Sequence, residues 1–358
     1  MRKFFTGRVA VALIVPAAIA LAFAGTTVAK STKSAHTQAG LLVCALLPDT
    51  TSSTRYTLFD APLLSKAFKA GHVPGKVYNA QASPARQTAQ AKGCLALGVK
   101  VLLLDQLDAA SGKAITNLAV AKGVKVIDYD RLVVGSKASY YVSFNNVKVG
   151  GLQGAGLVAA LKASGKYSQH PVIAELNGGI TDNNAHLFKQ GYDAILKPLY
   201  AAGTFKLADA GDQWTDWDPI KGRTIFDQML TRNNNAIDGV LAANDGLAGA
   251  VIASLKAHNL QPIPLTGQDA TPTGLQFILA GWQTGTVFKP IALEAAAAAK
   301  AAINIIRGQP VKTNGAVSGT KSILLTPIWV TKSNVGTVFA SGQVKKSDVC
   351  TGDYAQYC

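Results

Sequence analysis

Short aliphatic runs alternate with longer helical patterns along most of the chain, and this order limits the fold to a few architectures. The first runs are Leu41–Leu47, Lys76–Ala82, Lys100–Gln106, Lys125–Arg131 and Tyr140–Phe144. Helical patterns lie between them at Leu58–Ala70, Ala85–Leu97 and Gly112–Lys122. Strands separated by helices of about 10–15 residues build a parallel sheet, because the helix carries the chain back to start the next strand beside the first. The first part of the chain therefore predicts a doubly wound α/β unit.

The same alternation starts again after Val149. The second set of strand candidates is Pro171–Leu176, Phe205–Gly211, Asp238–Ala243 and Pro264–Gly267. The helices between them are Asn184–Tyr200, Pro219–Arg232 and Leu247–His258. Two successive sets predict two doubly wound parallel-sheet lobes. A (β/α)₈ barrel is the main alternative, but the extra strand pair around residues 131–144 interrupts the even spacing that eight units require.

The first 29 residues have the features of a secretory signal peptide. Three basic residues precede an apolar run from Val9 to Phe23, and small residues follow it as far as Ala29. The run is shorter than the ~20 residues of a membrane span. No cysteine stands at its end to carry a lipid. We therefore expect residues 1–29 to be cleaved and the mature protein to be periplasmic or secreted.

The four cysteines are an even number, which agrees with an oxidising compartment. Cys350 and Cys358 are close enough in sequence to close a small loop in the polar C-terminal tail. Cys44 and Cys94 would then form the other pair. Spacing does not fix the connectivity, and Cys44 could also be a small buried side chain on a strand.

Composition and charge restrict the functional classes. The chain is 48% hydrophobic and 15% charged, so it can bury a sizeable core and is not disordered throughout. Its formal charge of +15 would suit an acidic partner. The lysines are scattered rather than clustered, however, so we favour a solvated basic surface and expect no nucleic-acid partner.

Most sequence motifs of catalysis are absent. The chain has no phosphate loop, no dinucleotide-binding glycine pattern and no G-x-S-x-G turn. Its five histidines are dispersed without metal-ligand spacing. Asp212, Asp216 and Asp218 could supply the carboxylate pair of a glycoside hydrolase, but helix capping and solvation explain them better. We therefore expect no catalytic residue, no metal and no cofactor.

Polar side chains follow several predicted strands, where an open α/β sheet binds its ligand. Three strand ends carry such pairs, namely Asp130-Arg131, Asn244-Asp245 and Gln268-Asp269. Any one pair could instead cap the next helix, and only the recurrence favours a site. The loop at residues 211–219 adds Trp214 and Trp217. Aromatic rings stack on the C–H face of a sugar while Asp, Asn and Arg bind its hydroxyls, so these residues have the composition of a sugar cleft. A Trp is also often part of a core, and spacing does not distinguish the two roles.

Several motifs in the same order make the chain similar to a known family. The principal segments are Tyr129–Arg131, Tyr141–Gly150, Asp182–Ala185, Gly211–Trp214 and Thr266–Ala270, and the similarity continues through Gly281–Pro290 and Leu324–Pro327. They resemble the periplasmic sugar-binding proteins of ABC importers, in the ribose/galactose-type group, and most of all its xylose-binding members. The resemblance covers almost all of residues 40–331.

The resemblance implies a type I periplasmic binding protein fold, with two α/β lobes joined by three crossover strands and a sugar between them. It implies an N-terminal lobe of residues 40–145 and 286–325. The C-terminal lobe would comprise residues 146–285 and 326–342. Residues 343–358 would form a C-terminal tail for which the family offers no counterpart.

The family's sugar contacts can be carried over where the motifs match. The implied ligand-binding residues are Arg55, Tyr56, Asp130, Arg131, Asn184, Trp217, Asn244, Asp269 and Lys289. Two positions depart from the xylose-binding pattern. Tyr56 stands where a Trp is usual, and Gly178–Ile180 replaces a common Ser-Pro turn. Both changes affect the cleft and leave the identity of the sugar open.

The function implied is that of a non-enzymatic receptor that captures a monosaccharide and delivers it to an ABC permease in the membrane. D-Xylose is expected ahead of glucose, arabinose and ribose, and the protein is expected to be a monomer. A sugar-sensing module for a chemoreceptor or sensor kinase is the alternative, and an extracellular glycosidase remains formally open. A transcription regulator of similar fold would need a DNA-binding segment where the predicted signal peptide lies.

Overall fold

A computed structural model describes residues 40–358, so the predicted signal peptide at residues 1–29 lies outside the described residues. The strands form mainly parallel sheets in two separate lobes, with one antiparallel strand pair in each lobe, which confirms the predicted architecture and excludes a single closed barrel. Among residues 40–358, no helix combines the length and apolar character needed to cross a membrane.

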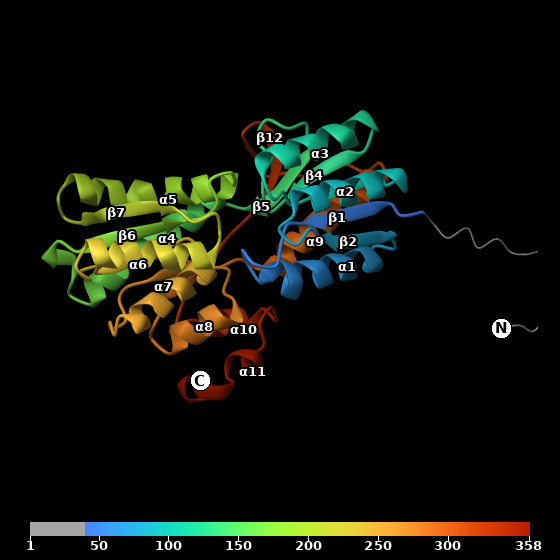
Figure 1. Cartoon of the computed structure of the whole chain (residues 1–358). Coiled ribbons are helices and arrows are strands. Elements are labelled where there is room, and N and C mark those ends of the chain that lie inside the picture. Colours follow the sequence, from blue (N-terminus) through green and yellow to red (C-terminus); the bar gives the residue numbers. More distant parts are fainter. Residues whose placement is uncertain (1–39) are drawn as a thin grey trace, which may run out of the picture. The chain divides into compact units, whose positions relative to one another are not determined.

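The N-terminal lobe is built on a seven-stranded sheet in the order β11-β12-β5-β4-β3-β1-β2. Its strands are β1 (Val43–Leu47), β2 (Gly75–Asn79), β3 (Val101–Leu104), β4 (Lys125–Tyr129), β5 (Tyr140–Phe144), β11 (Gly315–Val317) and β12 (Thr320–Leu325). Its helices are α1 (Ala61–Ala70), which follows the π-helical turn η1 (Tyr56–Asp60), α2 (Pro84–Ala96), α3 (Ala109–Ala121) and α9 (Ile291–Ile306). Helix α9 comes from late in the chain but packs against α1 (Figure 1).

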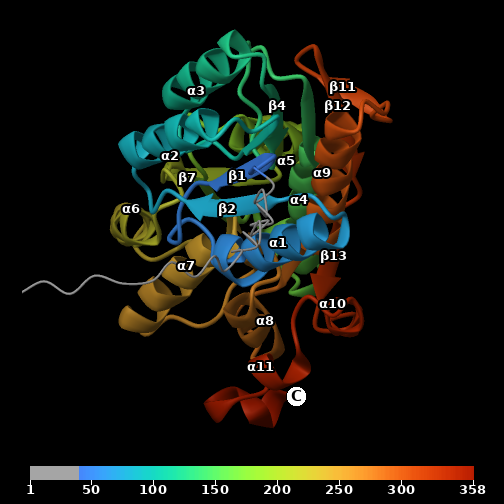
Figure 2. The same cartoon turned by 90° about the vertical axis from the view of Figure 1, so that its right-hand side faces the viewer.

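Strand β1 shows how the sequence pattern builds two cores in this lobe. Side chains alternate across a strand, so Val43 and Leu47 join the core under α1 and α9. Cys44 and Leu46 join the core on the other face, under α2 and α3 (Figure 2). Cys44 forms a disulfide there with Cys94 of α2. Both faces are covered, which explains why every residue of β1 is apolar and buried.

The C-terminal lobe contains two three-stranded groups, β7-β6-β8 and β13-β10-β9. A parallel bridge between Val240 and Leu265 joins the groups. The strands are β6 (Val172–Asn177), β7 (Lys206–Trp214), β8 (Gly239–Ala242), β9 (Thr266–Gln268), β10 (Gly285–Phe288) and β13 (Ile328–Thr331). The helices are α4 (Asn146–Ala163), the short 3-10 turn η2 (Tyr167–Gln169), α5 (Asn183–Ala201), α6 (Pro219–Arg232), α7 (Asp245–Ala257) and α8 (Pro272–Leu279).

The C-terminal tail packs against α8 of this lobe. It contains α11 (Lys346–Val349) and the 3-10 turn η3 (Gly352–Tyr357), and it follows α10 (Gly336–Ala340). Gln276 of α8 donates to the carbonyl of Val349 at 3.0 Å. A second disulfide joins Cys350 to Cys358.

The chain passes between the two lobes three times, at Asn145, at Lys289–Pro290 and at Thr326–Pro327. The first and third passages touch, because the backbone N–H of Asn145 donates to the carbonyl of Leu325 at 2.9 Å. Strand β10 pairs with β9 and β13 as far as Phe288. The second passage therefore lies a little beyond the lobe boundary at residue 286 that the sequence implied.

Candidate functional site

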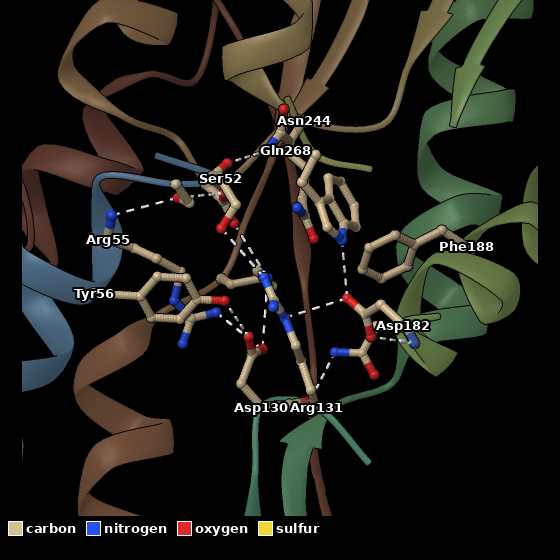
Figure 3. Close-up of a pocket in the computed structure, with 14 residues that line it drawn as sticks. Ser52, Arg55, Tyr56, Asp130, Arg131, Asp182, Phe188, Asn244 and Gln268 are labelled. Atoms are coloured by element: carbon tan, nitrogen blue, oxygen red, sulfur yellow. Dashed lines mark hydrogen bonds and ion pairs between the residues drawn. The ribbon is translucent and has the colours of Figure 1, made fainter. Parts of the chain in front are cut away.

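One cavity brings together all nine side chains singled out by sequence. It lies at the carboxyl ends of strands from both lobes, as expected for open α/β sheets. Figure 3 shows Arg55 and Tyr56 reaching it from one side and Phe188, on α5, from the other. Most of the polar lining residues are buried, so each needs a partner in the protein or in a ligand.

Three of the nine residues have a left-handed backbone, which is uncommon for residues other than glycine. The φ angles are 59° at Asp130, 61° at Trp217 and 101° at Asp269. Such conformations cost roughly 1–3 kcal/mol each and persist where surrounding structure imposes them, often at binding sites. Each residue directly follows a strand or lies in a loop after one, where the chain must turn sharply into the cleft.

On the N-terminal side of the cavity, a buried network of charges surrounds Arg55. Its guanidinium donates twice to Asp60, at 2.9 and 2.7 Å, once to Glu294 at 2.6 Å and once to Asp130 at 3.0 Å. The Arg55 side chain is 1% exposed. Four of its five N–H groups are therefore used inside the protein, and one on Nη1 remains to meet a ligand.

The network sets the protonation of two carboxyl groups. Burial alone would raise the pKa of Asp130, but the charges of Arg55, Lys289 and Arg131 lower it to about 2. Burial raises the pKa of Glu294 to about 8, because nearby carboxylates oppose the attraction of Arg55. Asp130 is therefore an acceptor of hydrogen bonds at neutral pH, whereas burial favours the protonated form of Glu294.

Tyr56 and Arg131 complete this wall. Tyr56 donates its hydroxyl to Asp130 Oδ2 at 3.0 Å, and the guanidinium of Arg131 lies over its ring at 5.6 Å. Arg131 also reaches the other lobe, since its Nε lies 3.3 Å from Asp182 Oδ2. Tyr56 thus lies between charged groups, and its hydroxyl is hydrogen-bonded to the carboxylate of Asp130.

On the C-terminal side, the wall is formed by two aromatic rings. Trp217 and Phe188 meet edge to face with centroids 6.2 Å apart. The indole Nε1 donates to Asp182 Oδ2 at 3.0 Å. Gly178 makes room for this indole, because a Cβ at Gly178 would overlap its six-membered ring. The glycine pair at residues 178–179, which departs from the family pattern, therefore has a steric role beside Trp217.

Two asparagines tie this wall to the N-terminal lobe. Asn184 donates to the carbonyl of Asp130 at 2.7 Å and accepts from the hydroxyl of Tyr141 at 2.8 Å. Asn244 donates to the carbonyl of Ser52 at 2.8 Å, while its Oδ1 caps α7. Both amides are thus partly used by the protein, and each keeps one N–H for a further acceptor.

The end of β9 contributes two more polar groups. Asp269 accepts a hydrogen bond from the hydroxyl of Ser53 at 2.8 Å, and Lys289 Nζ lies 3.1 Å from its other oxygen. Gln268 lines the cavity, and within residues 40–358 its buried Oε1 has no hydrogen-bond partner. A buried acceptor of this kind suits a ligand hydroxyl, because leaving it unpaired costs about 1–3 kcal/mol.

Five lining residues were not among the nine ligand contacts implied by the sequence: Ser52, Ser53, Asp182, Phe188 and Gln268. Asp182 and Gln268 lie within two residues of predicted positions. Phe188 follows Asn184 by one helical turn on α5, so their spacing places both on one face and could have identified it. The two serines lie in the loop after β1, where no sequence signal distinguishes them.

The loop carboxylates considered for glycoside hydrolysis do not line this cavity. Asp212 pairs with Lys189 at 2.9 Å, and Asp216 pairs with Lys221 at 2.5 Å. Asp218 caps α6. Within residues 40–358 no cluster of His, Cys, Asp and Glu has the arrangement of a metal site.

The arrangement as a whole suits a small polyhydroxylated ring. Its aromatic wall offers flat apolar faces, while its charged wall offers a carboxylate, two guanidinium groups and an ammonium group for hydroxyls.

Comparison with known proteins agrees with this geometry. A model of the periplasmic binding protein domain matches residues 44–310. The chain belongs to the periplasmic binding protein domain family. Members of this family bind solutes and are not catalytic.

Two curated relatives cover most of the chain. The D-xylose-binding periplasmic protein of Escherichia coli (strain K12) is 37% identical over 290 residues, which are 78% of this chain and 85% of the relative. A multiple sugar-binding periplasmic protein of Azospirillum brasilense is 35% identical over 255 residues, 67% of this chain and 70% of the relative.

A solved structure shares the fold over both lobes. It is a carbohydrate transporter solute-binding protein from Chloroflexus aurantiacus in complex with D-glucose. The TM-score is 0.78 at 28% sequence identity, and the match covers 86% of this chain and 97% of that one.

Proposed function

We propose that this protein captures a monosaccharide, D-xylose ahead of other aldoses, and delivers it to an ABC import permease. The observation that carries the proposal is the convergence of a charged wall and an aromatic wall, from two lobes, on one buried cavity. Relatives named for D-xylose and for multiple sugars support it.

In this proposal the two walls contact different parts of the sugar. Asp130 and Arg131 bind neighbouring hydroxyls, and Arg55 adds its remaining N–H while Tyr56 holds the carboxylate. Trp217 stacks on a face of the sugar. Asn184, Asn244, Asp269 and Lys289 bind the hydroxyls that point toward the C-terminal lobe.

We also propose that the lobes close around the sugar. The lobes remain those implied by the sequence, with the second passage at Lys289–Pro290, and the three passages act as a hinge. A ligand that contacts both walls must favour the closed form, because only that form satisfies both sets of contacts. Small-angle X-ray scattering should give a smaller radius of gyration with saturating sugar, and identical profiles despite binding would contradict closure.

The setting proposed for this activity is outside the cytoplasm, after removal of residues 1–29. A sensor role in chemotaxis or signalling would use the same cleft, and it is distinguished by whether loss of the protein abolishes sugar uptake or only the response to sugar.

The direct test is calorimetric titration of the chain from Lys30 with D-xylose, D-glucose, L-arabinose and D-ribose. We expect the tightest binding for D-xylose and a higher melting temperature with that sugar, since a ligand of the native state stabilises it. Tighter binding of glucose would agree with a role as a sugar receptor but would contradict the proposed preference for D-xylose. Absence of heat with every aldose, together with clear binding of an amino acid or nucleoside, would reject the sugar proposal.

A further inference from the structure

The two lobes carry different surface charge. Of the seven acidic residues in the N-terminal lobe, six are buried and Asp108 is only partly exposed, as the N-cap of α3. The same lobe exposes fourteen basic side chains: Lys66, Lys69, Lys76, Arg86, Lys92, Lys100, Lys113, Lys122, Lys125, Lys137, Lys300, Arg307, Lys312 and Lys321. Within residues 40–358, none of these fourteen side chains forms an ion pair. The cations that do form ion pairs are Arg55, Arg131 and Lys289 in the cleft and others in the C-terminal lobe.

The C-terminal lobe shows that this is not a general property of the chain. Several of its exposed cations form ion pairs with acids, as Lys166 does with Asp238 at 3.0 Å, Lys197 with Asp193 at 2.9 Å and Lys221 with Asp216 at 2.5 Å. If the basic residues were distributed evenly over the surface, ion pairs of this kind would occur on both lobes.

Eight of the fourteen cations gather at one end of the N-terminal lobe, which we call the basic pole. Parallel strands all start at the same edge of a sheet, and the helices between them end there. The register places the starts of β1, β2, β3 and β4 side by side. The members of the basic pole are Lys69, Lys76, Lys100, Lys122, Lys125, Lys137, Arg307 and Lys321. The sugar cleft lies at the opposite ends of the same strands.

Helix dipoles account for part of this pattern but not for all of it. Lys69, Lys122 and Arg307 stand at helix C-termini, where a positive charge is favourable. Lys100 and Lys125 stand at the starts of strands, where no helix end attracts them, and their backbones are in contact, since Lys125 N–H donates to the Lys100 carbonyl at 3.0 Å. Mutual repulsion of these cations is therefore not offset within the lobe.

A cavity opens in the basic pole between two of its lysines. It has a volume of about 500 Å³ and is flanked by Lys125 and Lys321. Hydroxyl groups of Ser139, Tyr140 and Ser318 also line it. Within the described chain no hydrogen bond or ion pair occupies either ammonium group. Two lysines and several hydroxyl-bearing residues around one cavity supply the chemistry that binds a phosphate.

We propose that the basic pole docks on an anionic lipid surface, with a phosphate of a lipid headgroup in the cavity between Lys125 and Lys321. The described part of the chain enters the N-terminal lobe at this pole, because Gly40 leads directly into β1. The preceding residues 30–39 add Lys30 and Lys33 and no acid, and the apolar run from Val9 to Phe23 lies before them. Lipid is favoured over a small anion because the eight cations extend over a whole end of the lobe, which matches an extended anionic surface. Docking would leave the sugar cleft accessible at the opposite end.

The test measures co-sedimentation of the chain from Lys30 to Cys358 with vesicles, in low salt and at physiological ionic strength. Vesicles of phosphatidylglycerol and phosphatidylcholine are compared with vesicles of phosphatidylcholine alone. The pole variant is Lys100→Glu, Lys125→Glu and Lys321→Glu. Its matched control is Lys148→Glu, Lys206→Glu and Lys345→Glu, three exposed positions of the C-terminal lobe and tail with the same change in net charge. Sugar binding and melting temperature verify that both variants fold.

We expect binding to the anionic vesicles only, weakened by salt, and a loss of about 100-fold or more in the pole variant with little loss in the control. Equal losses in the two variants would show a general charge effect and overturn the proposal. No binding to anionic vesicles would overturn it as well. Equally tight, pole-dependent binding of a DNA duplex or of inorganic phosphate would reject lipid as the specific partner.

Discussion

The two walls of the cleft occupy equivalent places in two similar lobes, yet they are built from different chemistry. The N-terminal wall is a network of buried charges centred on Arg55 and Asp130. The C-terminal wall consists mainly of rings and amides, with Trp217 against Phe188 and two asparagines beside them. Position at the strand ends therefore determines where a site forms, while the side chains determine how each wall is held together.

This difference has consequences for stability. Buried charges must be compensated by one another, so loss of one member leaves its partners uncompensated in a medium of low dielectric constant. Rings and amides impose no such requirement, and their loss chiefly removes contact area or single hydrogen bonds. We therefore expect variants of the N-terminal wall to affect folding and variants of the C-terminal wall to affect affinity.

The largest effect is expected for Arg55→Ala. It leaves the carboxyl groups of Asp60, Asp130 and Glu294 without their common partner, and we expect the free energy of unfolding to fall by about 3–5 kcal/mol. The comparison is Asn184→Ala on the other wall, with an expected loss of about 1–2 kcal/mol. Urea titrations of both variants measure this, and a smaller loss for Arg55→Ala than for Asn184→Ala would contradict the distinction.

The two disulfides allow a similar comparison between an element inside a lobe and one at the chain end. The Cys44–Cys94 bridge spans 50 residues and ties β1 to α2, whereas Cys350–Cys358 spans 8 residues in the tail. Replacing the first pair with Ala should lower stability by about 2–4 kcal/mol, because closing a longer loop restricts the unfolded chain more. The tail pair should matter much less. Thermal unfolding of the two double variants compares them, and titration of the unfolded, unreduced protein should find no free thiol.

Trp217→Ala should weaken sugar binding by about 1–3 kcal/mol, through lost stacking area, while the fold remains intact. The matched control is Trp214→Ala, which removes a ring that contacts His186 outside the cavity. Calorimetry of the two variants decides between them. A large loss in Trp214→Ala with unchanged affinity in Trp217→Ala would place the stacking contact elsewhere.

A dependence of stability on pH is also expected from Glu294. Its pKa is raised by burial from an ordinary value of 4.5 to about 8, so the folded protein holds a proton that the unfolded chain has released. Stability should therefore fall as pH rises from about 4.5 to about 8, by at most about 1.4 kcal/mol per pH unit. Glu294→Gln should flatten this slope. A slope that is unchanged in the variant would show that other groups cause it.

Asp130 should act in the opposite direction at low pH. Its pKa is lowered to about 2, so its contribution to stability is lost as pH falls from about 4 toward 2.

The sequence predicted residues that line one cavity, but it did not predict helices α4, α8 and α9 of the fold. Most of the nine candidates lie at strand ends or in loops, whereas Tyr56 begins η1 and Asn184 lies in the first turn of α5, and all nine line the cavity. Helix α4 was not predicted, because four glycines lower the helical propensity of residues 146–163. In the structure Gly150 lies so close to the backbone of Phe188 that a Cβ would overlap it, and tight packing against α5 stabilises the helix instead.

The contacts between the lobes could not be predicted for a different reason. Ser53 and Asp269 are 216 residues apart in sequence, and their hydrogen bond depends on how the two lobes face each other. Neither local pattern nor composition contains that information.

The most direct measurement is a crystal structure of the protein with D-xylose. We expect one sugar ring in the cavity, with Trp217 against its face and hydrogen bonds to Asp130 and Arg131 on one side and to Asn244 and Asp269 on the other. A sugar that contacts one lobe alone, or that lies outside this cavity, would contradict a shared site with a charged and an aromatic wall.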